Sequence, residues 1–186
     1  MDPRLENYID LVRDITAESL PDDLMVPLIV QQAKMALAEG FELAPEQKAT
    51  NGAHHGRHLL YEDPCTGWVA VAMAWPAGAD SQPHDHGTWG VVGVLEGELE
   101  LTEYEPITDG EKLREKTRFT AGPGDVASVI PPAKDVHRMR NASDSTTITI
   151  HVYGQPIESC RAFDAETGES RLLTPTYTST PEALTS

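Results

Sequence analysis

Two histidines separated by one residue are the clearest candidates for chemistry in the chain. His84 and His86 lie in the run PHDHGTWG, which we expect at the edge of a β-strand. Residues i and i+2 of a strand point to the same face, so both imidazoles can reach one ion while Asp85 points away. Neutral imidazole is the commonest metal ligand in proteins. The spacing favours a metal site, although two surface histidines beside a turn fit the same pattern.

Glycines and a third histidine surround this pair. The pattern G-x5-H-x-H followed by G-x6-G runs from Gly78 to Gly97, and the later run GDVASVIPPAKDVHRMRN contains His137. Together these segments resemble the two motifs of the cupin superfamily, whose members are small antiparallel β-barrels (jelly rolls) that hold a metal near one mouth. The resemblance implies a metal site formed by His84, His86 and His137.

One position departs from the common cupin pattern. Many cupins carry a glutamate ligand shortly after the histidine pair, but here the matching position is Gly90 or its neighbour Val91. The nearest carboxylate downstream, Glu96, lies at an expected turn and is a poor candidate. Three neutral histidines leave a divalent ion with its full charge and several open positions. Such a site suits an anionic ligand together with a diatomic gas, and it differs from the two-histidine, one-carboxylate triad of most non-haem iron oxygenases.

A cupin with three histidines and this glycine resembles the thiol dioxygenase family, which includes the cysteine dioxygenases. The bacterial members are the most similar, since their HDHxxWG run appears here as HDHGTWG, and the resemblance extends from about Arg57 to Arg161. It implies Fe(II) as the cofactor and addition of both atoms of O2 to the sulfur of a small carboxylate-bearing thiol, giving a sulfinate. Cysteine is the first substrate implied and 3-mercaptopropionate the next.

A polar pattern in the run TTITIHVY adds to this resemblance. Thr149, His151 and Tyr153 alternate with aliphatic residues, which places the three on one strand face. Buried there, they would need hydrogen bonds to one another. They resemble the family's Ser-His-Tyr relay with threonine in place of serine, which implies that His151 orients Tyr153 toward substrate or bound oxygen. A half-buried strand with an outward polar face is the alternative.

Two arginines are candidates for binding the substrate carboxylate, which a guanidinium can grip with two parallel hydrogen bonds. Arg57 resembles the carboxylate-binding arginine of the cysteine dioxygenases. Arg161 falls near a different functional arginine of the 3-mercaptopropionate enzymes. The resemblance leaves open which of the two acts, and a surface position is the alternative for either.

Other reactive or aromatic residues receive simpler interpretations. Gly90 occupies the place of the cysteine that is cross-linked to tyrosine in animal cysteine dioxygenases, so we expect no cross-link. We expect Cys65 and Cys160 to be ordinary reduced thiols. We expect His54 and His55 to be exposed and His58 to point away from Arg57. Trp75 and Trp89 are expected to pack in the core or in the wall of the pocket.

The helices and strands that position these residues are predicted from residues that commonly begin or end such elements. Asp2 and Pro3 mark the start of a first helix that Pro21 ends or resets, and Pro27 is expected to open a second helix that Gly40 stops. A short third helix is expected after residue 45. Strands are expected over 57–63, 67–75, 90–95, 98–104, 124–130 and 146–153.

Closely spaced strands without intervening helices predict a mainly β protein with an antiparallel barrel or sandwich. With the resemblance, this becomes a cupin-type jelly roll preceded by helices. We expect residues 1–50 to pack on the barrel and residues 51–186 to form the barrel with a C-terminal extension, in one structural domain. The tail after Phe163 is rich in Thr, Ser and Glu and is expected to be extended or frayed at its end.

Composition excludes several classes of function. The chain has 186 residues, 14 Lys and Arg against 30 Asp and Glu, and a net charge of −16. This balance argues against nucleic acid or an anionic membrane as partner. Two cysteines cannot form a disulfide framework, and no secretory signal or membrane span is expected, so we expect a cytoplasmic monomer or small homo-oligomer. Two alternatives stay open: another metal-dependent cupin enzyme, or a non-catalytic cupin that binds a metal or small molecule.

Overall fold

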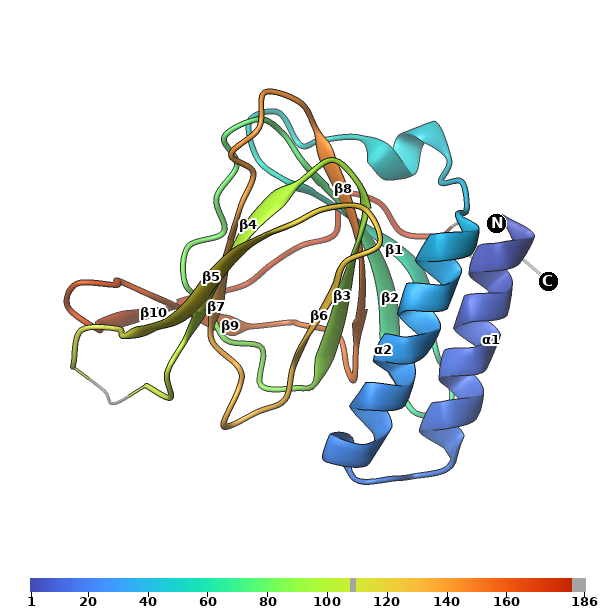
Figure 1. The fold of residues 1–186 in the computed structure, drawn as a ribbon, viewed down its shortest axis with the longest axis horizontal. Coiled ribbons are helices and arrows are strands. Elements are labelled where there is room, and N and C mark those ends of the chain that lie inside the picture. The colour runs from blue at the N-terminus through green and yellow to red at the C-terminus, as the bar shows by residue number, and fades with distance from the viewer. Residues whose placement is uncertain (108–109, 182–186) are drawn as a thin grey trace.

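Two helices cover one side of an antiparallel β-barrel (Figure 1). The computed structural model describes residues 1–107 and 110–181. Within them the helices are α1 (Pro3–Ala17), α2 (Asp22–Glu39) and the short 3-10 helix η1 (Pro45–Lys48). The strands are β1 (Gly56–Glu62), β2 (Val69–Trp75), β3 (Gly90–Glu96), β4 (Leu99–Tyr104), β5 (Glu115–Ala121), β6 (Val126–Val129), β7 (His137–Arg140), β8 (Thr147–Tyr153), β9 (Cys160–Phe163) and β10 (Ser170–Leu173).

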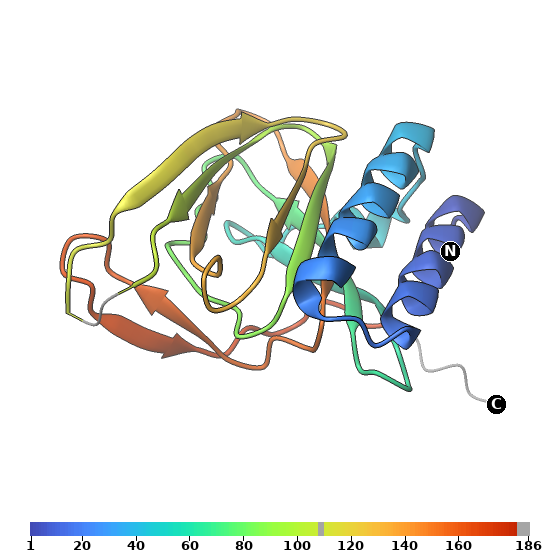
Figure 2. The ribbon, with the colours of Figure 1, turned by 60° about the horizontal axis from the view of Figure 1, so that its bottom comes forward.

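The strands form two main sheets with antiparallel pairing throughout. One sheet has the order β1-β2-β8-β3-β6 and the other the order β5-β4-β7, while β9 and β10 form a hairpin. Figure 2 shows the two sheets curving around a common interior. Side chains of both sheets meet there in one buried cluster, which includes Val71 of β2, Leu101 of β4 and Met139 of β7. The expected jelly-roll barrel with helices in front of it is therefore confirmed.

Strand β2 is buried on both faces, and alternate residues of its sequence pack into two different clusters. Val69, Val71, Met73 and Trp75 belong to the interior cluster of the barrel. The alternate residues are alanines, and they belong to the cluster between the sheet and the helices, with Ile29 of α2.

The first helix begins as its sequence predicts, and the second does not. The carboxylate of Asp2 accepts a hydrogen bond from the backbone N–H of Arg4 at 2.8 Å, which caps α1. Helix α2 begins at Asp22, so Pro27 lies inside it and the expected start at Pro27 is wrong. Proline removes one hydrogen bond within a helix. The turn nevertheless stays helical, with Val26 buried on the side that packs against the barrel.

All six expected strands are present with ends shifted by at most a few residues, but four strands were not expected: β5, β7, β9 and β10. Strand β5, with the sequence EKTRFTA, is exposed at six of its seven positions and lies at a sheet edge. It therefore lacks an apolar alternation. The other three have four residues each, which is too short for a periodic signal.

The C-terminal segment is extended, as expected, and it is attached to the barrel over its described length. The backbone N–H of Thr178 donates to the carbonyl of Arg57 at 2.6 Å, and Leu59 donates to the carbonyl of Ser179 at 2.9 Å. The expected fraying of the end concerns residues 182–186, which lie outside the described residues. No helix in the described part of the chain combines the length and apolarity that a membrane crossing requires.

Candidate metal centre and its pocket

The histidine pair lies on an irregular segment and not on a regular strand, which corrects the expectation from sequence. This segment runs between β7 and β9: His84 and His137 exchange backbone hydrogen bonds at 2.9 and 3.2 Å, and Asp85 donates to the carbonyl of Arg161 at 3.1 Å. The isolated bridges keep the backbone extended here. The side chains therefore alternate as on a strand, with His84 and His86 facing the barrel interior and Asp85 facing Arg161.

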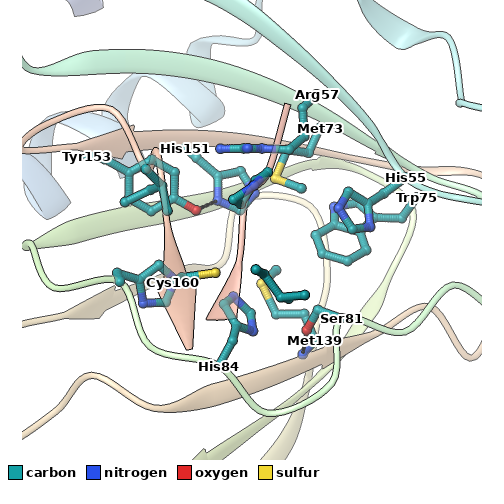
Figure 3. Close-up of a pocket in the computed structure, with 14 residues that line it drawn as sticks. His55, Arg57, Met73, Trp75, Ser81, His84, Met139, His151, Tyr153 and Cys160 are labelled. Carbon is teal, nitrogen blue, oxygen red and sulfur yellow. Dashed lines mark hydrogen bonds between the residues drawn. The ribbon is translucent and has the colours of Figure 1, made fainter. Parts of the chain in front are cut away.

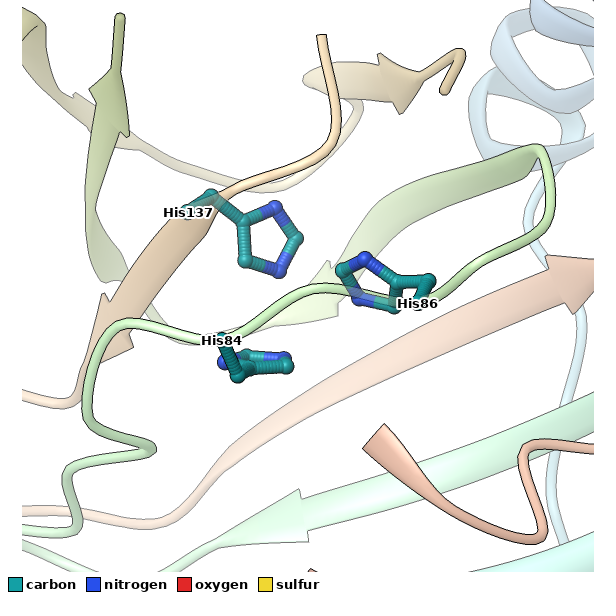
Figure 4. A group of neighbouring side chains, drawn as sticks. All are labelled: His84, His86 and His137. Carbon is teal, nitrogen blue, oxygen red and sulfur yellow. The ribbon is translucent and has the colours of Figure 1, made fainter. Parts of the chain in front are cut away.

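Three imidazoles converge at this point (Figure 4). One nitrogen from each of His84, His86 and His137 lies within 4.8 Å of the others. The ring centroids are 4.7 to 4.9 Å apart. The Nε2 atoms of His86 and His137 are buried without a hydrogen-bond partner among the described residues. Buried polar atoms without partners are rare in proteins, so these nitrogens fit a bound divalent ion.

Hydrogen bonds from Nδ1 fix the ring orientation of two of the histidines. Nδ1 of His84 donates to the carbonyl of Gln82 at 3.0 Å, and Nδ1 of His86 donates to the carboxylate of Asp135 at 3.0 Å. Each bond places the ring hydrogen on Nδ1 and leaves a lone pair on Nε2. Metal-binding histidines are commonly held in this way. Asp135 was not singled out from the sequence, where its position two residues before His137 was the available signal.

Loss of solvation keeps the rings of His84 and His137 uncharged. Burial, and then the neighbouring His86, lower the pKa of His84 to about 3. Burial also holds the pKa of His137 well below its ordinary value, with the other two imidazoles as further causes. Both rings are therefore neutral at physiological pH. Neutral rings are the form that binds a metal.

A chain of hydrogen bonds runs along the inner face of β8. Thr149 Oγ1 lies 2.8 Å from His151 Nε2, and His151 Nδ1 lies 2.8 Å from the Tyr153 hydroxyl. These three side chains are buried, and the aliphatic residues between them pack against the helices. The polar face of β8 therefore points inward, which rules out the alternative of an outward polar face. Tyr153 stacks on His86 with ring centroids 5.6 Å apart, so the chain ends beside the histidines.

Trp75 adds a fourth member that the sequence did not single out. Its Nε1–H donates to Thr149 Oγ1 at 2.9 Å. An indole N–H can only donate, so the threonine oxygen accepts this bond and its own hydrogen is left for His151. His151 then donates through Nδ1 to the Tyr153 oxygen. In this arrangement the hydroxyl hydrogen of Tyr153 remains available to the pocket.

A cavity of about 80 Å³ lies against His84 and His86 (Figure 3). This volume suits a small molecule and not a polymer. None of the described residues that line it is an Asp or Glu, although the chain as a whole carries a charge of −16. The lining residues are His55, Arg57, Met73, Trp75, Ser81, His84, His86, Met139, His151, Tyr153, Ile157, Cys160, Leu173 and Pro175.

The two candidate arginines have different surroundings. Arg57 is buried and lines the cavity. Arg161 does not line it: its Nε donates to the carboxylate of Asp85 at 2.6 Å, and about half of its side chain is exposed. Because Asp85 faces away from the histidines, its partner Arg161 lies on the opposite side of the segment. The geometry thus brings only Arg57 to the cavity.

The remaining histidines and tryptophans match their expected positions except for His55. His54 is exposed, and His58 is buried and bonded to the carbonyl of Ala49 and the hydroxyl of Ser179. His55 is half-buried, lines the cavity and packs on Trp75 with ring centroids 4.9 Å apart, so the expected exposure is wrong. The loop places this ring against Trp75 at the cavity, which the Gly-Ala composition could not reveal. Trp75 and Trp89 are buried.

Gly90 and Tyr153 are directly opposite each other in the pairing of β3 with β8. A Cβ atom added to Gly90 would lie 2.9 Å from Cδ1 of Tyr153, which is too close.

Both cysteines are free. Cys65 is exposed, while Cys160 is buried and lines the cavity. Burial raises the pKa of the Cys160 thiol.

Comparison with known proteins now identifies the family. A family model described as Cysteine dioxygenase type I matches residues 54–166, which include the three histidines and the chain of hydrogen bonds on β8. The chain belongs to the cysteine dioxygenase type I family. Membership in this family confirms the resemblance to the cysteine dioxygenases drawn from the sequence motifs.

Two curated relatives of this family member share about a quarter of their aligned residues with it. It is 28% identical to cysteine dioxygenase type 1 of Rattus norvegicus and 27% identical to that of Homo sapiens, in each case over 110 residues. The match covers 58% of this chain and 54% of each relative, so the chain spans about half the length of the curated relatives it matches.

Solved structures similar to this family member are cupins and related proteins. A protein with a double-stranded β-helix domain from Klebsiella pneumoniae is 19% identical, with a TM-score of 0.44, and the match covers 73% of this chain and 96% of that one. The cupin domain of a transcriptional regulator from Enterobacter cloacae is 21% identical, with a TM-score of 0.40, and the match covers 55% and 97% of the two chains.

Proposed function

We propose that this protein is a non-haem iron dioxygenase that adds O2 to the sulfur of a small carboxylate-bearing thiol. One observation carries the proposal: three imidazoles converge beside a cavity that is also lined by a buried arginine and the end of a hydrogen-bonded relay. Membership in the cysteine dioxygenase type I family supports the same chemistry. Cysteine is the first candidate substrate and 3-mercaptopropionate the second.

The proposed cofactor is Fe(II), held by His84, His86 and His137. Bound there, it would supply neighbouring open positions at which a thiol sulfur and O2 meet. The protein contributes the geometry: the Gln82 carbonyl and the Asp135 carboxylate fix the rings of His84 and His86, so these two nitrogens do not need to reorganise when the ion binds.

Arg57 is the proposed partner of the substrate carboxylate. Its guanidinium is the fixed positive charge among the cavity residues, and it makes no ion pair with any described residue. A buried charge without a counter-ion favours an anionic ligand. Arg161, in contrast, is already paired with Asp85.

Tyr153 is the proposed hydrogen-bond donor to the reacting group, with His151, Thr149 and Trp75 as the residues that orient it. Burial raises the pKa of the Tyr153 phenol, so the hydroxyl keeps its hydrogen at physiological pH. The relay leaves that hydrogen directed away from His151. It can then be donated to substrate or oxygen at the histidines, because the phenol ring stacks on His86.

The test is O2 consumption by Fe(II)-loaded protein with cysteine, 3-mercaptopropionate, cysteamine and mercaptosuccinate in parallel. We expect O2 uptake matched one-to-one by a sulfinate product, measured by mass spectrometry, with a carboxylate-bearing thiol preferred. The variant His86→Ala is the control for uptake by free iron. Bound iron without O2 uptake for any of the thiols would contradict the proposal and favour another cupin chemistry or a binding protein.

A further inference from the structure

The C-terminal segment of residues 173–179 forms one wall of the candidate pocket. Leu173 and Pro175 line the cavity. The segment then continues along β1, where the hydroxyl of Thr178 accepts a hydrogen bond from the backbone N–H of Arg57 at 3.0 Å. The family match ends at residue 166, so this wall belongs to a part of the chain that the family model does not cover.

Tyr177 of this segment contacts the arginine of the pocket. The guanidinium carbon of Arg57 lies 5.2 Å from the centre of the Tyr177 ring. This distance is within the range of a cation–π interaction, which is stronger when both groups are shielded from water. Arg57 is buried, and Tyr177 is half-buried against the interior cluster of the barrel.

The charges around Arg57 explain why such a support is needed. Burial lowers the pKa values of His55 and His151, and the positive charge of Arg57 is the next cause, so both imidazoles lie within its field. No carboxylate of the described residues forms an ion pair with Arg57. A long, flexible arginine side chain without a counter-ion has several rotamers, and holding one of them costs conformational entropy. A ring packed against the guanidinium reduces that cost before a ligand arrives.

We propose that Tyr177 is a positioning residue for Arg57 and that the C-terminal segment thereby determines affinity for thiols that carry a carboxylate. The aromatic ring performs this role. The Tyr177 hydroxyl is buried without a hydrogen-bond partner among the described residues, so it contributes nothing that a phenylalanine would lose. This inference rests on the proposed function, because it takes the substrate carboxylate as the ligand of Arg57.

The test measures binding to Fe(II)-loaded protein by calorimetry without O2, using 3-mercaptopropionate and cysteamine, which lacks the carboxylate. We expect Tyr177→Leu and Tyr177→Met to weaken 3-mercaptopropionate binding about three- to tenfold. Cysteamine binding should stay unchanged in both variants, which also shows that the pocket is intact. Tyr177→Phe should bind both thiols like the wild type. Leu172→Ala, at a 69% exposed position of β10 directly before the segment, is the matched control.

Equal losses for both thiols, or no loss for 3-mercaptopropionate, would overturn the inference. So would a wild-type protein that binds no carboxylate thiol. Turnover is measured separately with O2. If the protein binds 3-mercaptopropionate through Arg57 and Tyr177 but forms no sulfinate, the proposed dioxygenase activity is contradicted and this inference still holds. The two failures are therefore distinguishable.

Discussion

Arg161 donates from Nε to the carboxylate of Asp85 at 2.6 Å, on the side of the segment opposite the two histidines that flank Asp85. Of the two candidate arginines, Arg57 on β1 is therefore the one that lines the cavity. The sequence motifs make both arginines candidates for binding the substrate carboxylate. The alternation of side chains about Asp85 places Arg161 on the side away from the histidines.

The arginine assignment predicts a difference between two matched variants. Arg57→Gln should raise the KM for a carboxylate-bearing thiol about 10- to 100-fold, because a charge-assisted hydrogen-bond pair is lost. Arg161→Gln should leave KM near the wild-type value, since its partner is Asp85. Steady-state O2 uptake measures both, and an equal effect of the two substitutions would contradict the assignment.

The metal site predicts selective loss of the ion. His86→Ala removes one of three converging nitrogens and should abolish stoichiometric retention of iron, measured by elemental analysis after gel filtration. His54→Ala is the control, because His54 is exposed and outside the group. Asp135→Asn, which weakens the support of the His86 ring, should lower metal affinity about 10- to 100-fold. Full iron retention by His86→Ala would rule out His86 as a ligand.

The relay predicts a loss of turnover without a loss of metal. Tyr153→Phe keeps the ring that stacks on His86 and removes the hydroxyl that bonds to His151. We expect iron content to stay at the wild-type level and kcat to fall at least tenfold, because a positioned hydrogen-bond donor is missing. Tyr61→Phe removes a hydroxyl bonded to Asp63 outside the pocket and should retain full kcat. Unchanged kcat for Tyr153→Phe would remove Tyr153 from the mechanism.

The close approach of Gly90 to Tyr153 predicts a stability difference between two glycines. A Cβ at Gly90 meets the Tyr153 ring at 2.9 Å and Val129 at 3.1 Å, so Gly90→Ala should lower the free energy of unfolding by about 1–3 kcal/mol. Gly122→Ala is the control, since nothing lies within 4 Å of its added Cβ. Urea unfolding measures both variants. Equal stability of the two would show that the barrel relaxes around position 90.

The two free thiols should differ in their reaction with iodoacetamide. Burial raises the pKa of Cys160, so at pH 7 its thiolate fraction is smaller than that of an ordinary cysteine, and the reacting species is the thiolate. Cys65 is exposed and should be alkylated first. Raising the pH toward the pKa of Cys160 should increase its rate, as followed by peptide mass spectrometry. In urea both thiols should react alike, and faster labelling of Cys160 in the native protein would contradict its burial.

The fold of this protein was largely readable from its sequence because most of its strands are periodic. In the run TTITIHVY polar and aliphatic residues alternate, which predicts a strand. The run VAVAMAW is long and apolar enough to predict a buried strand. Strand β5 was not predicted because Phe119 and Ala121 are its only apolar residues and the strand lies at an exposed edge. Pro27 was misjudged because proline within a helix costs a hydrogen bond that the packing of α2 against the barrel outweighs.

Local spacing by itself determined which side chains can face together: His84 with His86, and Thr149 with His151 and Tyr153. Only the tertiary structure decided what those faces meet. It brought His137 to the pair from a strand about fifty residues away and turned the polar face of β8 inward. It also placed His55 at the pocket and Tyr177 against Arg57, from loop and tail segments. The physical reason is that alternation depends on neighbouring residues, whereas the contacts between segments depend on how two sheets and a C-terminal segment close around one interior.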